Sequence, residues 1–161
     1  MTEPESNESP PGWAALLPEH DAAAARILAD CAALASVEGA ATALAALRND
    51  PEGELLGWVD NGQVIAVYGL RRGALNYDLL WLAVDPVWRG QRYGRSALVD
   101  ALRRVGRKPL TVEADEATKG WFQQLGFRIV GRRPLSEGGA RYRLGWYAPR
   151  RPGEPGHGAH G

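Results

Sequence analysis

The alternation of apolar and polar positions predicts strands and helices in turn along residues 13–147 of this chain. The clearest local pattern is a pair of apolar runs, 55–59 and 64–70, on either side of the tripeptide Asp-Asn-Gly at 60–62. Asn-Gly readily adopts the positive φ angles of a two-residue turn. This segment therefore predicts a tight β-hairpin.

Residues 94–105 predict an amphipathic helix, because apolar side chains recur at helical spacing. Charged side chains occupy the other face, and Gly106 predicts the end of the helix. The apolar stripe consists of Ala97, Leu98, Ala101, Leu102 and Val105.

Weaker patterns complete the order of elements. Asp21 is expected to cap a first helix, in which Ile27, Cys31 and Leu34 recur at helical spacing. The order is strand, two helices, three strands, helix, strand, helix and two strands. The remaining helices are predicted at 39–48 and 117–124, and the remaining strands at 13–17, 76–84, 110–113, 127–130 and 141–147.

The composition is that of one ordinary globular domain. Of the 161 residues, 45% are hydrophobic and 24% are charged, which suffices to bury a sheet between helices. Segments 1–12 and 149–161 are rich in polar, proline and glycine residues, so they are expected to be disordered tails around a domain at 13–148. The sequence shows no secretory signal pattern and no long apolar run, which predicts a cytoplasmic protein without a membrane partner.

Charge is balanced overall but uneven along the chain. The formal net charge is zero, which disfavours a nucleic acid as the main partner. Residues 1–60 hold 11 acidic and 2 basic side chains, whereas residues 61–161 hold 8 acidic and 17 basic ones. An anionic ligand is therefore expected on the C-terminal two-thirds, although unevenly solvated faces would produce the same distribution.

Cysteine and histidine predict neither a disulfide nor a metal site. Cys31 is the single cysteine, and it is expected to be a buried helix residue rather than a nucleophile. The three histidines, His20, His157 and His160, are too scattered for the usual zinc patterns.

The segment 79–98 carries the candidate chemistry. An apolar strand is followed by a loop with glycines and arginines, and then by the start of the predicted helix. A helix N-terminus offers unpaired amide groups and a partial positive charge, to which Arg89, Arg92 and Arg95 add. This pattern predicts a phosphate site, whereas the alternative is a loop that only connects a strand to a helix. Neither G-x-x-x-x-G-K-[ST] nor G-x-G-x-x-G is present, which disfavours nucleoside-triphosphate and dinucleotide ligands.

Two sequence motifs resemble those of the GNAT acetyltransferase superfamily. LAVDPVWRGQRYGRSAL at 82–98 resembles its acetyl-CoA signature, R/Q-x-x-G-x-G/A, and DEATKGWFQQLGF at 115–127 resembles its later element, N-x-x-A-x-x-F-Y-x-x-x-G-F. The resemblance implies an α+β, three-layer fold with about four helices and a mixed, mostly antiparallel sheet of six to seven strands. In this fold the fourth and fifth strands, here 76–84 and 110–113, run parallel and splay apart around a slot for the thioester.

The resemblance also implies an activity. A member of this superfamily would transfer an acetyl group from acetyl-CoA, its co-substrate, to a primary amine of a small molecule or a peptide. The amine would attack directly in a ternary complex. No metal is implied, and a homodimer is compatible with the resemblance.

The same resemblance assigns residues to the coenzyme. The loop is expected to hold the diphosphate mostly through backbone amides, and the strand before it is expected to pair with the pantetheine arm. A strand amide near Val84 would stabilise the oxyanion. The residues implied for the diphosphate are Arg89, Gly90, Gln91, Arg92, Tyr93, Gly94, Arg95 and Ser96, and those for the rest of the coenzyme are Leu82, Ala83, Val84, Asp115 and Phe122.

Three features depart from the family pattern. Arg92 stands at its first glycine, Asp115 and Thr118 stand at its Asn and Ala, and Phe122 replaces a tyrosine thought to protonate the leaving thiolate. A thiol of pKa about 8.5 leaves as thiolate at pH 7 for roughly 2 kcal/mol, whereas deprotonating an amine of pKa about 10.4 costs about 4–5 kcal/mol. The missing acid is therefore tolerable, and a base is the greater need.

Two carboxylates are candidates for that base, directly or through water. Glu113 is expected at the end of the fifth strand and Asp78 in the fourth, although a solvated or salt-bridged carboxylate is the alternative for each. The tryptophans, among them Trp88 and Trp121, are expected in the core or at its rim rather than in an acceptor pocket. Candidate acids that spacing does not rank are Tyr77, Tyr93 and Tyr142.

Two other functions fit the sequence less well. A domain that binds acyl-CoA as a sensor, without transfer, is the main alternative, because Phe122 has no hydroxyl group and the base is unproven. Binding of RNA or DNA by the arginine-rich half comes third. It predicts a steep loss of affinity with salt.

Overall fold

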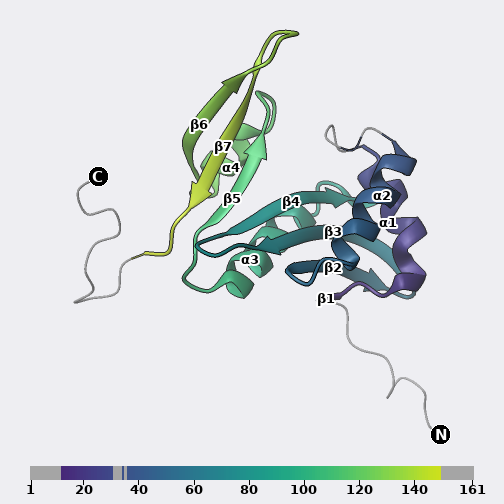
Figure 1. The fold of residues 1–161 in the computed structure, drawn as a ribbon. Coiled ribbons are helices and arrows are strands. Elements are labelled where there is room, and N and C mark those ends of the chain that lie inside the picture. Colours follow the sequence, from purple (N-terminus) through teal and green to yellow (C-terminus); the bar gives the residue numbers. More distant parts are fainter. Residues whose placement is uncertain (1–11, 31–33, 35, 150–161) are drawn as a thin grey trace, which may run out of the picture.

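The computed structural model describes residues 12–30, 34 and 36–149 (Figure 1). The two predicted tails therefore fall almost entirely outside the described residues, and so does Cys31 with its expected place in a helix. Within the described residues, no helix is long and apolar enough to cross a membrane.

Seven strands form one mixed sheet in the order β1-β2-β3-β4-β5-β7-β6. Neighbouring strands are antiparallel except β4 and β5, which run parallel. The mostly antiparallel sheet with parallel fourth and fifth strands is therefore confirmed. The strands are β1 (Trp13–Ala15), β2 (Gly53–Asp60), β3 (Gln63–Arg72), β4 (Tyr77–Val84), β5 (Leu110–Ala114), β6 (Arg128–Pro134) and β7 (Ala140–Trp146).

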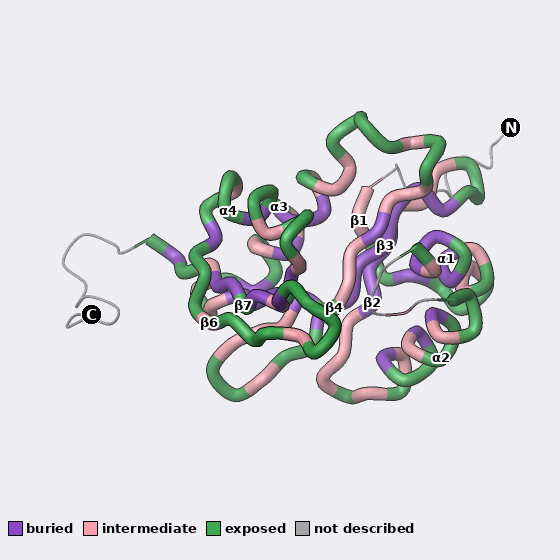
Figure 2. Tube along the Cα trace, turned by 90° about the horizontal axis from the view of Figure 1, so that it is seen from above, coloured by how far each residue is buried: buried purple, intermediate pink, exposed green. Residues whose placement is uncertain are grey.

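Helices cover both faces of the first half of the sheet. α1 and α2 pack on one face of β2, β3 and β4, and α3 packs on the other, so this half has three layers (Figure 1, Figure 2). α4 packs against β6 and β7. The helices in the described chain are α1 (Asp21–Leu28), α2 (Val37–Arg48), α3 (Tyr93–Val105) and α4 (Lys119–Gln124), with 3-10 turns at Pro18–His20 and Pro86–Trp88.

The position of β3 in the middle layer explains the apolar run at 64–70. Val67 packs with Leu55 in the core under α1 and α2, whereas the adjacent Tyr68 packs with Leu70 in the core under α3. Successive side chains of a strand point to opposite faces. A strand covered by helices on both sides therefore needs apolar residues at nearly every position.

The second half of the sheet, β5, β7 and β6, has helix cover in the described chain on one face only. Val112 and Leu144 point into the core on the side of α3 and α4, and Glu113 and its cross-strand partner Arg143 alternate with them on the other face. Figure 1 shows this half rising away from the first. A charged, open sheet face consequently lies beside the end of β4.

The hairpin and the end of the third helix agree with the sequence prediction. Asn61 and Gly62 have φ angles of 52° and 74° in the two-residue turn between β2 and β3. Gly106 ends α3 with a φ of 66°, a conformation that glycine adopts without steric cost.

The prediction for the first helix was wrong at both ends. Asp21 is the first residue of α1 rather than its cap, and its carboxylate pairs with Arg48 of α2 at 2.5 Å. The helix ends at Leu28, so Leu34 lies outside it. The ion pair, which links two consecutive helices, outweighs the local capping preference of Asp21.

Several elements are longer than predicted, and the structure shows why for α2 and β6. α2 begins at Val37 because the Ser36 side chain caps it, accepting a hydrogen bond from the backbone amide of Gly39, three residues further on. β6 reaches Pro134, because two glycines at 138–139 with positive φ turn the chain so that Pro134 pairs with Ala140. Because most residues of this hairpin are polar, the hydrophobicity pattern could not predict the full length of the strand.

A polar network joins the sheet to α3 inside the core. Tyr68 is fully buried, and its hydroxyl group donates a hydrogen bond to Asp100 of α3. Arg104 donates to the same carboxylate at 2.7 Å and to the main-chain oxygen of Trp13 in β1 at 3.3 Å. Burial, and next the Asp100 carboxylate, raise the pKa of Tyr68, so its hydroxyl keeps the proton that it donates.

Tyr68→Phe is expected to lower the free energy of unfolding by about 1–3 kcal/mol, because it leaves the mostly buried Asp100 carboxylate without one of its donors. Urea denaturation would measure this as a lower midpoint with an unchanged slope. Tyr147→Phe, at a residue that is 38% exposed, is the matched control and should change stability by less than about 0.5 kcal/mol. Equal midpoints for the two variants would contradict the role assigned to the buried network.

Candidate active site

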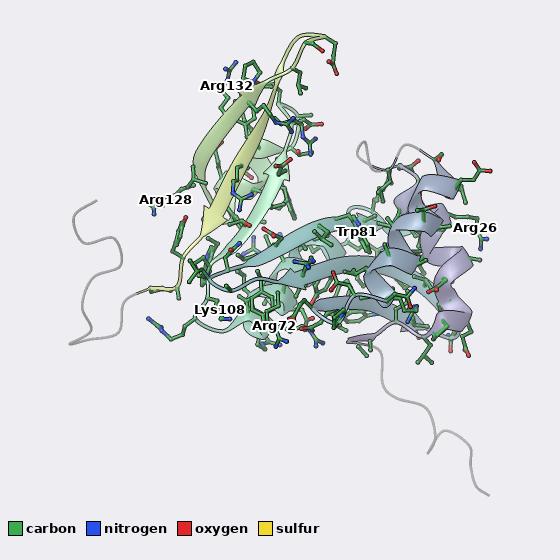
Figure 3. All side chains as sticks on the ribbon, viewed as in Figure 1. Arg26, Arg72, Trp81, Lys108, Arg128 and Arg132 are labelled. Carbon is green, nitrogen blue, oxygen red and sulfur yellow. The ribbon has the colours of Figure 1, made fainter. Side chains whose placement is uncertain are left out.

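β4 and β5 pair through only three residues each, 77–79 with 110–112. Beyond this ladder β4 continues to Val84 and β5 to Ala114, and no described strand lies between them. Figure 1 shows the two strands diverging. In Figure 3, Trp81 lies on β4, and Arg132 lies on β6, in the half of the sheet that rises with β5. The splayed fourth and fifth strands expected from the family are therefore present.

A β-bulge in β4 lies at the start of this divergence. On the side of β3, Leu79 pairs with Leu70 but Trp81 pairs with Gly69, so Leu80 is an extra residue. A bulge bends its strand and increases the local twist. A Cβ atom at Gly69 would lie 2.8 Å from the Trp81 ring, so the bend also requires a glycine in β3.

A cavity of about 650 Å³, here called the slot, occupies the space between the diverging strands. Its walls come from β4, β5 and α4, with further side chains from the turn after α1, the loop before α3, and β7. Its volume is in the range of sites for small organic ligands. Of the residues assigned from the sequence, the slot is lined by Leu82, Ala83, Val84, Arg89, Glu113, Asp115 and Phe122.

A second cavity of about 390 Å³, here called the loop cavity, lies at the N-terminus of α3. Val84, Arg89 and Trp121 line both cavities, so the loop cavity adjoins the slot. One extended ligand can therefore reach from the helix N-terminus into the gap between the strands. Of the residues assigned to the diphosphate, the loop cavity is lined by Arg89, Gly90, Arg92, Tyr93, Gly94 and Arg95.

The loop cavity has the electrostatic character of an anion site. The first amides of α3 have no partner within the helix, and the helix dipole adds about half a positive charge there. Arg89, Arg92 and Arg95 contribute guanidinium groups to the lining, which includes no carboxylate from the described residues. A diphosphate group suits this combination.

Arg92 adopts the backbone geometry of the glycine that it replaces. Its φ and ψ are 70° and 20°, in the left-handed region, directly before α3. This conformation costs a residue with a Cβ atom about 1–2 kcal/mol, whereas glycine adopts it freely. The chain thus keeps the expected loop conformation and gains a guanidinium group at a cost in stability.

The other loop positions divide into open and structural ones. Gly94 has room for a Cβ atom, which would lie 3.6 Å from Trp121. The Ser96 hydroxyl accepts a hydrogen bond from the Trp13 indole at 2.9 Å, so it anchors β1 to α3. Neither Ser96 nor the exposed Gln91 lines the loop cavity. Coenzyme contacts of these two residues stay a prediction.

Asp115 and Thr118 form a closed turn before α4. The Asp115 carboxylate accepts hydrogen bonds from the Thr118 backbone and hydroxyl at 2.9 and 2.8 Å, and the Asp115 backbone donates to the Thr118 hydroxyl at 3.2 Å. The hydroxyl hydrogen bond is the main cause that holds the pKa of Asp115 below its ordinary value. The two residues that depart from the family pattern therefore satisfy each other's hydrogen-bonding groups.

Among the described residues, no tyrosine lines the slot. Phe122 does, and it is 8% exposed and packs edge-on against Phe127 with ring centroids 5.4 Å apart. Tyr93 lines the loop cavity instead, and the Tyr142 hydroxyl donates to Glu116. The structure therefore places no described tyrosine where it could protonate a thiolate in the slot.

Glu113 is the candidate base that reaches the slot. It extends from β5 on the open face of the sheet, and its side chain is 47% exposed. Its carboxylate lies 3.7 Å from Arg141 and 3.8 Å from Arg133. These distances exceed hydrogen-bond length, so the carboxylate oxygens have room to accept a hydrogen bond from water or an amine.

Asp78 lies at the closed end of the divergence and is not part of the slot lining. Its carboxylate accepts hydrogen bonds from the Thr111 hydroxyl and, at 3.3 Å, from the Asn76 side chain, and it lies 3.7 Å from Arg143. The structure does not bring Asp78 and Glu113 together at one cavity. A catalytic role for Asp78 stays a prediction with less support from geometry.

The main chain of β4 offers a further polar group to the slot. The Asp85 amide donates to the Ile65 carbonyl oxygen at 2.8 Å, on the side of β3. Because N–H groups of an antiparallel strand point alternately to its two sides, the Val84 amide points toward the slot. An amide at this place can donate to a developing oxyanion.

Sequence reasoning did not assign several of the residues that line the two cavities, and four of them carry polar or aromatic groups that matter for a ligand. Asp30, Trp121 and Arg141 line the slot, and Trp88 lines the loop cavity, where its indole nitrogen is buried without a hydrogen-bond partner among the described residues. The two tryptophans lie inside the sequence motifs but were assigned to the core or its rim. Nothing in their local sequence marks Asp30 or Arg141, because the fold brings them to the slot from distant segments.

Comparisons with known proteins agree with this geometry. Residues 51–129 match the family model described as an acetyltransferase (GNAT) domain, and a search of curated proteins finds no significant match. A solved aminoglycoside 6'-N-acetyltransferase complexed with coenzyme A is 15% identical, covers 86% of this chain and 98% of its own, and has a TM-score of 0.75.

Two further solved structures have similar folds. The ribosomal-protein-S18-alanine N-acetyltransferase from Escherichia coli is 20% identical, covers 85% of this chain and 93% of its own, and has a TM-score of 0.68. Ard1 from Thermoplasma volcanium is 20% identical, covers 87% of this chain and 99% of its own, and has a TM-score of 0.69. At these identities the solved structures support the fold alone.

The family match runs from the turn before β2 to the start of β6, so it includes the loop before α3, the diverging strands and α4. These segments form most of the walls of both cavities. The family match, the fold and the two motifs agree: residues 51–129 are a match to the GNAT acetyltransferase domain, and the chain has the fold of solved GNAT acetyltransferases.

Proposed function

We propose that this protein transfers the acetyl group of acetyl-CoA to a primary amine of a small molecule or a peptide, by direct attack in a ternary complex. The observation that carries the proposal is the junction of the electropositive loop cavity with the slot. A coenzyme with a diphosphate in its middle and a thioester at its end suits these two environments. The coenzyme A bound to an aminoglycoside acetyltransferase of the same fold supports the proposal.

The diphosphate binds at the N-terminus of α3. Gly90, with a φ of 84°, shapes the loop, and the helix amides face the phosphate oxygens. Arg92 and Arg95 neutralise part of the charge. From there the pantetheine arm passes Trp121, which lines both cavities, and runs along the free edge of β4.

The reaction takes place at the open end of the slot. The amine nitrogen attacks the thioester carbonyl carbon, and the Val84 amide donates to the oxygen as negative charge develops on it. The new C–N bond replaces the C–S bond, and the coenzyme leaves as a thiolate. Glu113 takes the proton of the amine, directly or through a water molecule, and returns it to solvent.

A leaving thiolate is compatible with the aromatic residue at position 122. With a thiol pKa of about 8.5, departure without an acid costs roughly 2 kcal/mol at pH 7. Phe122 contributes an apolar, largely buried surface to the slot, and it has no proton to donate. The proton removed from the amine is the larger cost, which is why the carboxylate at the slot matters more than a tyrosine.

A sensor that binds acyl-CoA without transfer is the second candidate. The observation that favours it is the absence of a tyrosine from the slot lining in the described chain. Acetyl-CoA, a panel of primary amines and a free-thiol assay separate the two functions. Coenzyme binding without amine-dependent thiol release would favour the sensor, and release that depends on the amine supports transfer.

Gly94→Asp is expected to weaken coenzyme A binding by at least about a hundredfold, because it sets a carboxylate against the phosphates. The fold should persist, since a side chain fits there and an acidic residue suits the first turn of a helix. Gly94→Ala is the matched control and should bind with little change. Calorimetric titration measures both affinities. Equal affinities in the two variants would show that the diphosphate does not bind at this loop.

Arg92→Gly is expected to change stability and affinity in opposite directions. Relief of the left-handed conformation should raise the free energy of unfolding by up to about 1 kcal/mol. Loss of the guanidinium group should weaken coenzyme A binding by about three- to tenfold. Arg92→Gln keeps the strain and removes the charge, so it should weaken binding without stabilising the protein. Unchanged affinity in both variants would exclude a coenzyme contact for Arg92.

Glu113→Gln is expected to lower kcat/KM by about 10²–10⁴. The loss should be greatest at pH values below the pKa of the acceptor amine, because there the amine arrives protonated and a base must remove its proton. Asp78→Asn, measured over the same pH range, tests the other carboxylate and should lack this pH dependence. Glu137→Gln, in the exposed β6–β7 turn, controls for charge. A uniform loss, or none, in Glu113→Gln would exclude it as the base.

A further inference from the structure

Arg89 lies at the junction of the two cavities and already has an intramolecular partner. Its guanidinium Nη2 lies 3.3 Å from a carboxylate oxygen of Asp30, and its Nε donates to the Val84 carbonyl oxygen at 3.2 Å. Arg89 lines both cavities, whereas Asp30 lines the slot but not the loop cavity. The ion pair therefore connects the turn after α1 to the loop before α3, and both of its residues line the slot.

This ion pair is a weak competitor for a diphosphate. The two side chains are 53% and 62% exposed, and such surface pairs contribute little to stability. A diphosphate carries more charge than one carboxylate and can accept two parallel hydrogen bonds from a guanidinium group. A coenzyme in the loop cavity can therefore take Arg89 away from Asp30.

The exchange changes the charge of the slot. The other two acidic residues of its lining keep their neighbours: Glu113 lies 3.7 Å from Arg141, whose charge balances its own without a hydrogen bond. The Asp115 carboxylate accepts two hydrogen bonds from Thr118. In the part of the chain that the structure describes, Arg89 is the basic side chain paired with Asp30. Once Arg89 turns to the phosphates, Asp30 is a carboxylate at the slot without its cation.

We propose that Asp30 is a specificity-determining residue, which Arg89 holds until the coenzyme binds and which then pairs with a positive charge of the acceptor. The proposal rests on the proposed transfer and deepens it. Under the proposed transfer the reacting amine lies beside Glu113 on β5. Asp30 follows α1 and lines another part of the slot, so the charge bound by Asp30 is a second one on the same molecule. The acceptor class is an amine with a further cationic group.

The exchange between carboxylate and diphosphate is tested by calorimetric titration of coenzyme A into the full chain. Asp30→Asn should bind coenzyme about two- to fivefold more tightly, because Arg89 loses its competitor. The same substitution in an Arg89→Gln background should have no effect. Glu19→Gln removes an exposed carboxylate from the same end of the chain, outside both cavities, and should not change the affinity. Equal or weaker binding by Asp30→Asn would overturn the exchange.

The acceptor role is tested with α,ω-diamines of graded length, each compared with the monoamine of equal length. The unaltered protein should have a lower KM for at least one diamine than for its monoamine. At saturating acetyl-CoA, Asp30→Asn should raise the KM for that diamine about tenfold and change the KM for the monoamine by much less, so the preference for the diamine is lost. Asp30→Glu keeps the carboxylate on a longer side chain. This variant should therefore still have a lower KM for a diamine than for its monoamine, but the preferred diamine should be shorter.

The outcomes separate this proposal from the one on which it rests. Transfer to amines without a preference for any diamine, or a preference that survives Asp30→Asn, would overturn the role of Asp30 and leave the transfer intact. Coenzyme binding with no transfer to any amine would overturn the proposed function and the acceptor role together. The titration in the Arg89→Gln background would still decide whether Asp30 competes with the diphosphate.

Discussion

Two neighbouring parallel strands, β4 and β5, stop pairing after three residues, and the backbone groups beyond that point must find partners other than a strand. Such a break in the middle of a sheet is costly unless water or a ligand satisfies these groups. The bulge at Leu80 and the missing side chain at Gly69 create the break, and the helices on both sides keep it in place. The slot exists because β4 and β5 do not pair there. A ligand with amide groups of its own can form hydrogen bonds with the backbone groups that this leaves unpaired.

The loop before α3 shows a second compromise. A glycine at position 92 would be free of steric cost in the left-handed region, and the chain has an arginine there instead. The positive charge that this brings lies at the N-terminus of a 13-residue helix, whose dipole has the same sign at that end. Strain of this kind persists where the surrounding structure fixes the backbone, and it is concentrated at binding sites.

The sequence predicted the parts of the protein that local chemistry decides. The Asn-Gly turn, the apolar stripe of α3 and the loop before it follow from residues adjacent in sequence, and the structure has them at the expected places. The boundaries of α1 depend on an ion pair between helices, and the long β6 depends on cross-strand pairing. Asp30 and Arg141 reach the slot only through the tertiary fold, so no local pattern could have assigned them.

The hydrogen bond between the Trp13 indole and Ser96 has a consequence for local opening of the sheet. β1 has three residues and lies at the edge of the sheet, where β2 is its one strand neighbour in the described chain. Its attachment depends on the first turn of α3 through Ser96, and on Arg104 through the Trp13 carbonyl oxygen. Opening of β1 at that edge is consequently coupled to opening of the first turn of α3. A ligand that binds at the N-terminus of α3 and stabilises it therefore also slows amide hydrogen exchange in β1.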